Sequence, residues 1–384
     1  MSGMVRMPSP FVRRPRFLEK LPTLNLAQGN LEGIANEQYT AIETLTWETA
    51  TDWDNASSET ETVVHENFGD FTDTVVQLGY PSDVLDNLVA YWHLHEDSGS
   101  TAGDAGPNGI TGTINGATVG QSGILGTTSY QFDGSDDWVD FGDPSSLSSS
   151  SLGDSYSFFM WVNLSSTSGD WLSHASSSQN DNWRWYDGGS GNREWYTDDD
   201  NTDLQVAGSV ITGSWASYAG VYRTSQIELY ENGSSIGSSS ASSSTLATSS
   251  SPWALFSRGG DSGFVSGKAA FVLIFNDGLS DSEVSTLHDV TSGSLTTGTK
   301  SFSSSATPDL QNLSYSLNGG SIDLNVIGSP GTASEEIVTQ TLDGSTSYSL
   351  TWSNSHQDFQ LRPNLSVSGI TNASPTFDRG ELIA

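Results

Sequence analysis

Short apolar runs that alternate with polar residues recur along most of the chain, and turns rich in Gly, Ser, Asn and Asp separate them. Runs such as LVAYWHL, SFFMWVNL, WASYAGVYR and AAFVLIF have the length and composition of β-strands. Their spacing is typical of a β-sandwich. The stretch LSDSEVSTLHD differs, because Ser280 and Glu283 stand at capping-box spacing and predict a short helix. The pattern therefore predicts an all-β protein.

The same pattern divides the chain into four parts. In order, we predict a basic proline-rich arm, an N-terminal docking segment with a few strands, a large jelly roll and a small C-terminal β-sandwich of six or seven strands, at residues 1–30, 31–87, 88–293 and 294–384. In the last part, SIDLNVIG and SYSLTWS each predict a strand with alternating apolar positions. Serine runs at 145–151 and 238–251 predict loops.

The net charge of the chain limits the kinds of function that it can have. The chain has 46 acidic and 13 basic residues, which gives a net charge of −33, and only three of the basic residues are lysines. Such a surface favours a protein adapted to molar salt, where screening removes self-repulsion. An acidic secreted protein that depends on calcium is the competing interpretation. The bulk surface excludes nucleic-acid binding. No apolar run is long enough for membrane insertion.

The N-terminal residues carry the opposite charge. Arg6, Arg13, Arg14, Arg16 and Lys20 lie in the first 30 residues, which lack the apolar core of a signal peptide. One interpretation is a frayed tail, and the other is an arm that docks on an acidic neighbour in an assembly. There is no cysteine and hence no disulfide. We expect synthesis in a cytoplasm without a signal for export.

Several ordered pieces resemble one fold family. LVAYWHLHEDSGST, DAGPNGITGTINGATVG, YQFDGSDDWVDFG, IELYENGSSIGS and GKAAFVLIFNDGLSDSEVSTL resemble, in order, the conserved pieces of the laminin-G-like, concanavalin-A-like jelly rolls. The resemblance covers roughly 200 residues, and it implies the fold more strongly than a function, because this sandwich serves many roles. For the aspartate-rich stretch FDGSDDWVDFGD, it favours a structural signature, in which aspartates cap turn amides, over a metal site or a set of catalytic carboxylates.

The resemblance also raises the question of a structural calcium ion. Glu96, Asp104 and Asn108 match the loop part of the family's site. His95 and Ala270 stand where the family usually has aspartates. Both a calcium-bound loop and a metal-free loop therefore stay open. His93 and His95 share one face of a strand, as either a zinc pair or structural histidines.

No arrangement of residues for catalysis appears in the sequence. A glycosidase needs two carboxylates that flank a cleft, and no Glu-x-Asp-x-Glu run or Gly-x-Ser-x-Gly elbow occurs. We therefore expect a binding protein and not an enzyme. The predicted ligand-binding residues are Trp183, Trp185, Trp195 and Tyr196, whose rings stack on sugars in one interpretation and fill the core in the other.

The layout as a whole suggests a role. DWDNASSETETVVHENFGDF, the jelly roll and EEIVTQTLDGSTSYSLTWS resemble, in their order, structural proteins of tailed viruses of halophilic archaea. This resemblance implies a virion surface protein, such as a turret, decoration, tail-fibre or baseplate component, that attaches to host glycans. We expect it to form a symmetric homo-oligomer and to dock on other virion proteins through its N-terminal segment. A cellular lectin or adhesin of a halophile is the first alternative, and a carbohydrate-active enzyme is the second.

Overall fold

The computed structural model describes residues 44–47, 58–60, 63–64, 77–78, 80, 85–175, 183–188, 192–196, 204–224, 226–240, 251–297, 299–371 and 373–384. Ile42–Ala384 form one compact unit and Met1–Ala41 form another. All of the described residues belong to the first unit, so the arm with Arg6, Arg13, Arg14, Arg16 and Lys20 lies outside them.

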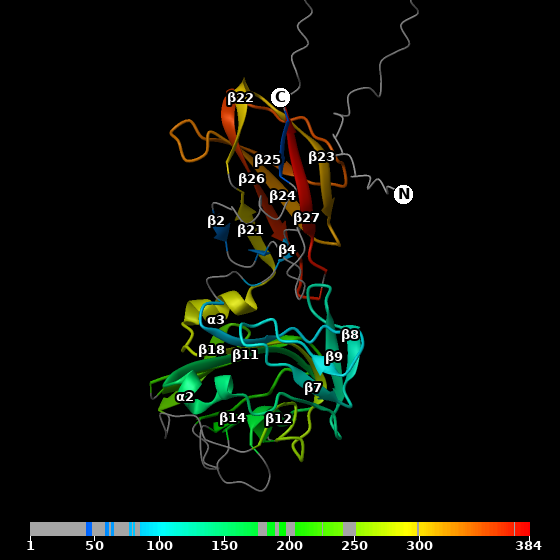
Figure 1. The fold of residues 1–384 in the computed structure, drawn as a ribbon, viewed down its shortest axis with the longest axis vertical. Helices are drawn as coiled ribbons and strands as arrows, with labels where there is room; N and C mark the ends of the chain where they lie inside the picture. The colour runs from blue at the N-terminus through cyan, green and yellow to red at the C-terminus, as the bar shows by residue number, and fades with distance from the viewer. Residues whose placement is uncertain are drawn as a thin grey trace, which may run out of the picture. The chain divides into compact units, whose positions relative to one another are not determined.

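Two antiparallel sheets of eight described strands each form a jelly-roll sandwich (Figure 1). The first sheet has the order β15(Leu204–Val206), β14(Arg193–Tyr196), β13(Trp183–Gly188), β12(Ser168–His174), β19(Trp253–Leu255), β10(Trp138–Asp140), β7(Gly112–Asn115), β6(Thr101–Ala102). The second has the order β18(Ser234–Ser240), β17(Gln226–Glu231), β16(Ala216–Arg223), β11(Ser155–Leu164), β20(Ser266–Phe275), β9(Thr128–Asp133), β8(Thr118–Ser122), with β5(Leu88–Trp92) also paired to β20. The predicted fold class is confirmed.

The central strand β11 explains why apolar runs in this region are continuous. Phe158 and Met160 point between the two sheets and join the sandwich core. Phe159 and Trp161 point to the opposite face of their sheet, where a second apolar cluster covers them. A strand buried on both faces has no polar side to alternate with.

Three short helices accompany the sandwich: η1(Ser145–Leu147), α2(Ser149–Leu152) and α3(Asp281–His288). The predicted capping box is confirmed, because the Ser280 side chain accepts from the Glu283 amide and the Glu283 carboxylate accepts from the Ser280 amide. The prediction of a loop over residues 145–151 is wrong. Leu147 and Leu152 are buried there, and their burial anchors the two serine-rich turns.

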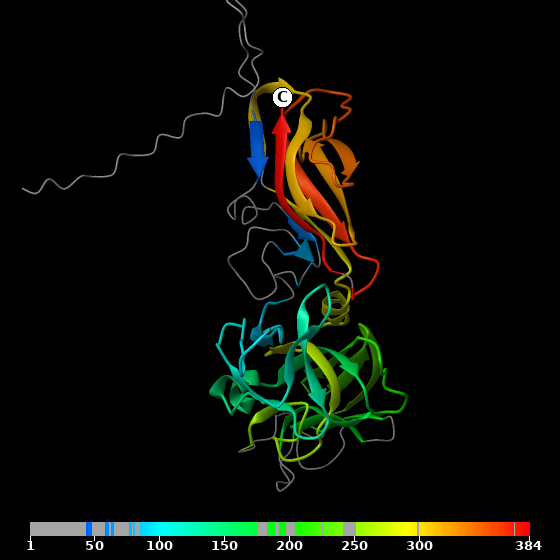
Figure 2. The same ribbon diagram turned by 90° about the vertical axis from the view of Figure 1, so that its right-hand side faces the viewer.

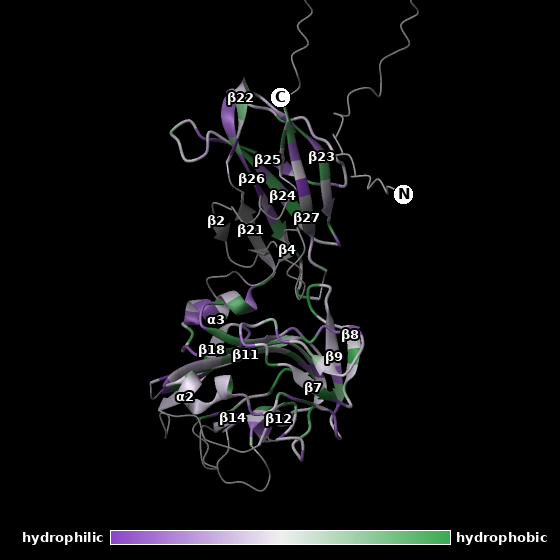
Figure 3. Cartoon of the chain, in the orientation of Figure 1, coloured by the Kyte–Doolittle hydropathy of each residue, from purple (hydrophilic) through white to green (hydrophobic). Residues whose placement is uncertain are grey.

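Residues 292–383 supply most of a second β-sandwich, the C-terminal module. One sheet has the order β1(Thr44–Trp47), β27(Thr376–Ile383), β23(Asp309–Ser316). The other has the order β2(Ser58–Thr60), β21(Ser292–Thr296), β26(His356–Ser366), β24(Ser321–Gly328), β25(Glu336–Thr341), with β22(Lys300–Ala306) also paired to β26. A separate pair joins β3(Val63–Val64) to β4(Gln77–Leu78). Figure 3 shows hydrophobic and hydrophilic residues mixed along β22, β24 and β27.

One predicted strand of the C-terminal module is present and one is not. Ile322, Leu324 and Val326 of β24 are fully buried, as their alternation predicts. SYSLTWS forms only an isolated antiparallel bridge, between Tyr348 and Leu310, and not a full strand. Groups just before and at the start of β23 take other donors of this stretch. The Leu350 amide donates to Asp309 Oδ1 at 2.8 Å, and Trp352 Nε1 donates to the Pro308 carbonyl at 2.8 Å.

Strands from far apart in the sequence complete the C-terminal module. β1 pairs with β27 in an antiparallel register from Thr44↔Ile383 to Trp47↔Gly380 (Figure 2). β2 pairs with β21. Two strands of the predicted docking segment are therefore part of the fold of the C-terminal module. In the described part of the chain, no helix has the length and apolar character needed to cross a bilayer.

Candidate functional site

The predicted ligand stretch lies on β13 and β14, and its tryptophans point into the sandwich. Trp183, Trp185 and Trp195 are at most 1% exposed and belong to the core between the two sheets. Of the two interpretations of these tryptophans, the structure agrees with the core. The indoles fill the space between the sheets and do not face solvent. The backbone of Tyr196 pairs with Arg184, whereas its side chain lies outside the described part of the structure.

The residues between these tryptophans face the other way. Successive side chains of a strand point to opposite faces of the sheet, so Arg184 and Tyr186 lie on the outer face. Arg184 binds the carboxylate of Asp170 on β12 through two hydrogen bonds, Nε to Oδ1 at 2.6 Å and Nη2 to Oδ2 at 3.1 Å. A bidentate pair fixes the plane of the guanidinium group.

Asp170, the acidic partner in this pair, is buried. Its side chain is 2% exposed. Burial raises the pKa of its carboxyl, and the hydrogen bonds and charge of Arg184 oppose that shift. The loop after β19 closes over it, because the Asp170 amide donates to the Gly263 carbonyl at 2.8 Å. Gly263 has φ +64, and a Cβ there would lie 2.1 Å from Asp170 Oδ2, so only glycine fits.

Two further contacts complete the cluster. The Arg184 Cζ atom lies 4.1 Å from the centre of the Tyr186 ring, a cation–π geometry. On the neighbouring strands, Gln205 Nε2 donates to Glu194 Oε1 at 2.6 Å. We name Asp170, Arg184, Tyr186, Glu194 and Gln205 the Arg184 face. It combines a ring, an amide and charged groups, which is the chemistry that binds hydroxyl-rich ligands.

The sequence interpretation missed the Arg184 face, although a signal for it was present. In WRWYD, the two tryptophans are the largest apolar side chains and occupy alternate positions. Assigning them to the interior would have placed Arg184 and Tyr186 outside. Asp170 had no signal in the sequence, since its role depends on the pairing of β12 with β13, in which Asp170 lies opposite Tyr186.

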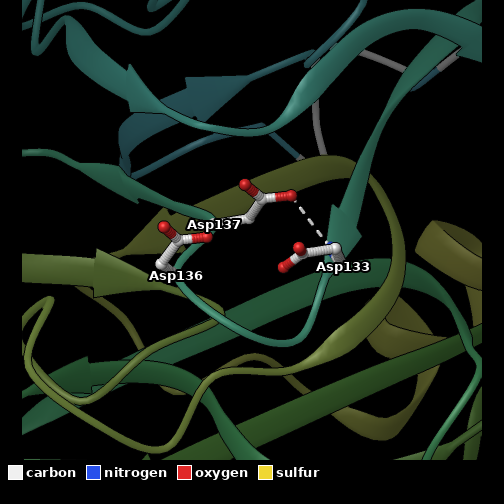
Figure 4. Close-up of side chains that lie close together, drawn as sticks. All are labelled: Asp133, Asp136 and Asp137. Carbon is white, nitrogen blue, oxygen red and sulfur yellow. Dashed lines mark hydrogen bonds between the residues drawn. The ribbon is translucent and has the colours of Figure 1, made fainter.

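The aspartate-rich stretch forms a turn in the structure (Figure 4). One carboxylate oxygen from each of Asp133, Asp136 and Asp137 lies within 4.8 Å of the others. The Asp133 amide donates to Asp137 Oδ2 at 2.9 Å, and the Ser135 amide donates to Asp133 Oδ1 at 2.7 Å. Burial raises the pKa of Asp137, and the charges of its two neighbours add to that shift. These hydrogen bonds agree with turn capping as the role of Asp133.

The loop that the family resemblance associates with calcium is held by hydrogen bonds. Asp104 accepts from the amides of Tyr91 and Gly106 through Oδ1 and from the amide of Ile110 through Oδ2. Glu96 accepts from the Gly103 amide and the Tyr130 hydroxyl.

Two further positions of that site have different surroundings. Asn108 donates its amide to the Val89 carbonyl. Ala270, which stands where the family usually has an aspartate, is fully buried among apolar residues. Calcium needs several oxygen ligands, and Ala270 offers no side-chain oxygen. A calcium ion held by Glu96, Asp104 and Asn108 therefore stays a prediction.

His93 and His95 do lie together, with ring centroids 5.1 Å apart. His93 also packs against Tyr91, at 4.1 Å between ring centroids, and against Phe271, at 5.9 Å. Burial lowers the pKa of His93 to about 3, and the charge of His95 adds to that shift. These ring contacts fit the interpretation of structural histidines.

Comparison with known proteins identifies the sandwich. Residues 133–285, which contain most strands of both sheets, match a family model described as the Concanavalin A-like lectin/glucanases superfamily. Residues 133–285 are a concanavalin-A-like domain. We use that name for the jelly roll, whose first strands lie just before the matched residues. No curated protein matches the sequence.

Solved structures with similar folds include parts of larger proteins. Domain 4 of the GH43 extracellular arabinanase AbnA from Geobacillus stearothermophilus, in complex with arabinotriose, is 20% identical over 53% of this chain and 98% of that chain, with a TM-score of 0.41. The binding domain of Paraclostridial Mosquitocidal Protein 1 is 13% identical over 72% and 76%, with a TM-score of 0.44. A mutant Trypanosoma rangeli sialidase with trans-sialidase activity is 11% identical over 53% and 33%, with a TM-score of 0.41. The match thus spans about a third of the sialidase.

Proposed function

We propose that the concanavalin-A-like domain binds a glycan and that the Arg184 face is its binding surface. The observation that carries the proposal is the alternation on β13, which buries Trp183 and Trp185 and turns Arg184 and Tyr186 outwards. Sugar hydroxyls need donors and acceptors held in place, and the buried Asp170 holds Arg184. The family description, which names lectins and glucanases, supports the same class of ligand.

We propose binding without hydrolysis at this face. A glycosidase needs one carboxyl group that can protonate the leaving oxygen and another that can attack or activate water. Here both carboxylates are committed to neighbours. Asp170 is buried and bound by Arg184, and Glu194 is 7% exposed and accepts from Gln205. Neither group is placed to flank a sugar ring.

We further propose that the chain is a surface component of a virion. The opposite charges of the arm and the rest of the chain support docking by the arm on an acidic neighbour, because a net charge of −33 includes five basic residues in the first 30. A symmetric homo-oligomer would repeat the Arg184 face and convert weak single contacts into avidity for host-surface glycans. A free-standing halophile lectin is the alternative that the assembly experiment distinguishes.

The binding test uses an array of neutral oligosaccharides in molar salt, followed by calorimetry on the best ligand. We expect Tyr186→Ala to abolish detectable binding, since it removes the ring. We expect Glu194→Gln to weaken binding by about tenfold, because it removes the charge-assisted hydrogen bond that holds Gln205 in place. Asp136→Asn is the matched control, because it removes one exposed negative charge from the same domain. Equal affinity for all variants would contradict the proposed site.

The assembly test compares the full chain with a version that lacks residues 1–41. This boundary keeps β1, which the C-terminal module needs for its pairing with β27. Light scattering after size exclusion in molar salt gives the mass. A defined oligomer that becomes a monomer on truncation supports docking through the arm. A monomer in both cases favours the free-standing lectin.

A further inference from the structure

A chain of three hydrogen-bonded side chains lies in the C-terminal module. Ser329 Oγ lies 2.9 Å from His356 Nδ1, and His356 Nε2 lies 2.9 Å from Glu336 Oε2. Ser329 follows β24, Glu336 begins β25 and His356 begins β26. Because β24 pairs with both of the other strands, the sheet itself brings the three residues together.

The hydrogen bonds around Glu336 determine which ring nitrogen of His356 carries the proton. Its Oε1 accepts from the Ser353 amide at 2.6 Å and its Oε2 accepts from the Asn354 amide at 3.0 Å. The hydrogen bond from the Ser353 amide, with that from His356, lowers the pKa of Glu336 to about 2. The ionised carboxylate therefore accepts the Nε2 proton of His356. The Nδ1 atom is left as an acceptor for the Ser329 hydroxyl.

Packing holds the imidazole in this orientation. His356 is 2% exposed. A Cβ on Gly328 would lie 2.4 Å from His356 Cδ2, so the ring lies directly against the backbone. Trp352 and Phe359 contact its other sides, with ring centroids 5.4 Å and 6.1 Å away. A ring confined in this way keeps Nδ1 directed at Ser329.

Ser329 has the features of a serine poised to react. Its φ is +50, in the left-handed region that a residue with a side chain seldom adopts. Such strain is concentrated at functional positions. The residue is partly exposed, so a reagent reaches it. The order carboxylate, imidazole, hydroxyl is that of serine-hydrolase triads, with the two ring nitrogens exchanged.

The amides needed for turnover are committed elsewhere. Acyl transfer is fast when amides stabilise the developing oxyanion. Here Pro330 has no N–H to offer. The Gly331 amide donates to Glu335 Oε2 at 2.7 Å, and the Ser329 amide donates to the Asp358 carbonyl at 2.9 Å. Ser329, His356 and Glu336 therefore match the part of a hydrolase site that activates the nucleophile. The part that stabilises an oxyanion is missing from the described residues, because the nearest amides are bound to other acceptors.

We propose that Ser329 is an acceptor site that takes up a single acyl or phosphonyl group from an activated donor, with His356 and Glu336 as its positioning residues. A bond forms between Ser329 Oγ and the acyl carbon or phosphorus, and the bond to the leaving group breaks. The Oγ proton passes to His356 Nδ1 and then to the leaving group. No atom is oxidised or reduced. Neither step has a free amide, among the described residues near Ser329, to stabilise an oxyanion. The good leaving group of the activated donor drives transfer to Ser329, whereas release by water must expel the serine alkoxide and is therefore slow.

The test treats the full chain in molar salt with a fluorophosphonate probe and follows intact mass, with peptide mapping of the adduct. We expect one adduct per chain, located at Ser329. Ser329→Ala should remove it, and Glu336→Gln should slow labelling at least tenfold by disrupting the relay. Ser334→Ala is the matched control, because Ser334 is an exposed serine of the same hairpin. Thermal melts verify that each variant is folded.

A second measurement separates an acceptor serine from a purely structural hydrogen-bond chain. With p-nitrophenyl acetate, the proposal predicts a burst of one equivalent of nitrophenol followed by slow release. A structural chain would give no burst, and the probe would label Ser329 no faster than other exposed serines. Either result overturns the proposal, as does equal labelling of Glu336→Gln and the unaltered chain.

Discussion

The concanavalin-A-like domain and the C-terminal module are both β-sandwiches, but their interiors are filled differently. The domain encloses Trp92, Trp171, Trp183 and Trp253, each fully buried. In the module, β24 contributes smaller aliphatic side chains, such as Leu324, and β26 and β27 add the rings of Phe359 and Phe377. Two eight-stranded sheets leave a broad space that large rings fill at few positions. In a chain with 34% hydrophobic residues, a few rings can therefore carry much of the burial.

Tryptophans in the core of the domain also bury polar N–H groups. The indole nitrogens of Trp171, Trp183, Trp185, Trp195 and Trp253 are buried and have no hydrogen-bond partner. An unpaired buried donor is unfavourable. The aliphatic side chains of β24 bring no such donors. The stability of the domain therefore depends on ring packing that outweighs this cost, whereas the buried Phe302, Phe359 and Phe377 of the module bring no polar donor.

The largest effect that we predict follows from this contrast. Trp183→Ala should lower the free energy of unfolding by about 4 kcal/mol, because a large cavity remains between the sheets. Leu324→Ala in the module should cost about 3 kcal/mol. Urea unfolding in molar salt measures both. A smaller loss for Trp183→Ala than for Leu324→Ala would contradict the importance given to the rings.

The next effect concerns the anchor of the Arg184 face. Arg184→Ala should cost about 3 kcal/mol, because it leaves the carboxylate of Asp170 buried without its partner. Adding Asp170→Asn should recover a large part of the loss, since the buried charge disappears. The same urea titration applies. If the double variant is no more stable than Arg184→Ala, the ion pair is not the cause.

Acid should weaken the two regions in different pH windows. The pKa of His93 is about 3 in the folded domain, below its ordinary value of 6.5, so folding excludes a proton that the unfolded chain binds. The contribution to stability is present above pH 6.5 and is lost as the pH falls towards 3. For Glu336 the pKa is about 2 against 4.5, so its contribution is lost between those values.

Melting temperatures between pH 7 and pH 2 check these windows. His93→Gln should lose less stability than the unaltered chain between pH 6.5 and 3, because glutamine does not titrate. Glu336→Gln should differ most above pH 4.5 and converge with the unaltered chain near pH 2. Parallel curves for either variant would mean that the substituted residue does not titrate with folding.

The smallest effect is expected at the capping box of α3. Ser280→Ala removes the acceptor for the Glu283 amide and should cost about 1 kcal/mol. The substitution Ser285→Ala, at an exposed serine inside the same helix, serves as the control. Differential scanning calorimetry resolves the two. A cost well above that of the control assigns the stabilisation to the cap.

The sequence pattern predicted the elements that local physics determines. Strands such as β11 and β24 and the cap at Ser280 follow from apolar period and capping chemistry. The Arg184 face could not be predicted with the same ease, because Asp170 lies 14 residues before its partner and meets it only through strand pairing. The Ser329–His356–Glu336 chain likewise depends on three neighbouring strand ends.

The tryptophans show the limit of composition arguments. A tryptophan suits both a sugar-stacking surface and a core, and the direction of the side chain decides between them. That direction depends on which face of the sheet is covered by the second sheet. SYSLTWS is a second case in which the sequence pattern does not decide the structure. Its alternation is that of a strand, but its amide and indole donors bind Asp309 and the Pro308 carbonyl.

The pairing of β1 with β27 has a mechanical consequence. Tension applied through residues 1–41 enters the folded part at Thr44, which lies opposite Ile383. The hydrogen bonds of this short ladder are therefore the first to bear the load, ahead of any strand of the concanavalin-A-like domain. If the arm is an anchor, the pairing of β1 with β27 yields first, and the concanavalin-A-like domain keeps its shape while the chain is pulled.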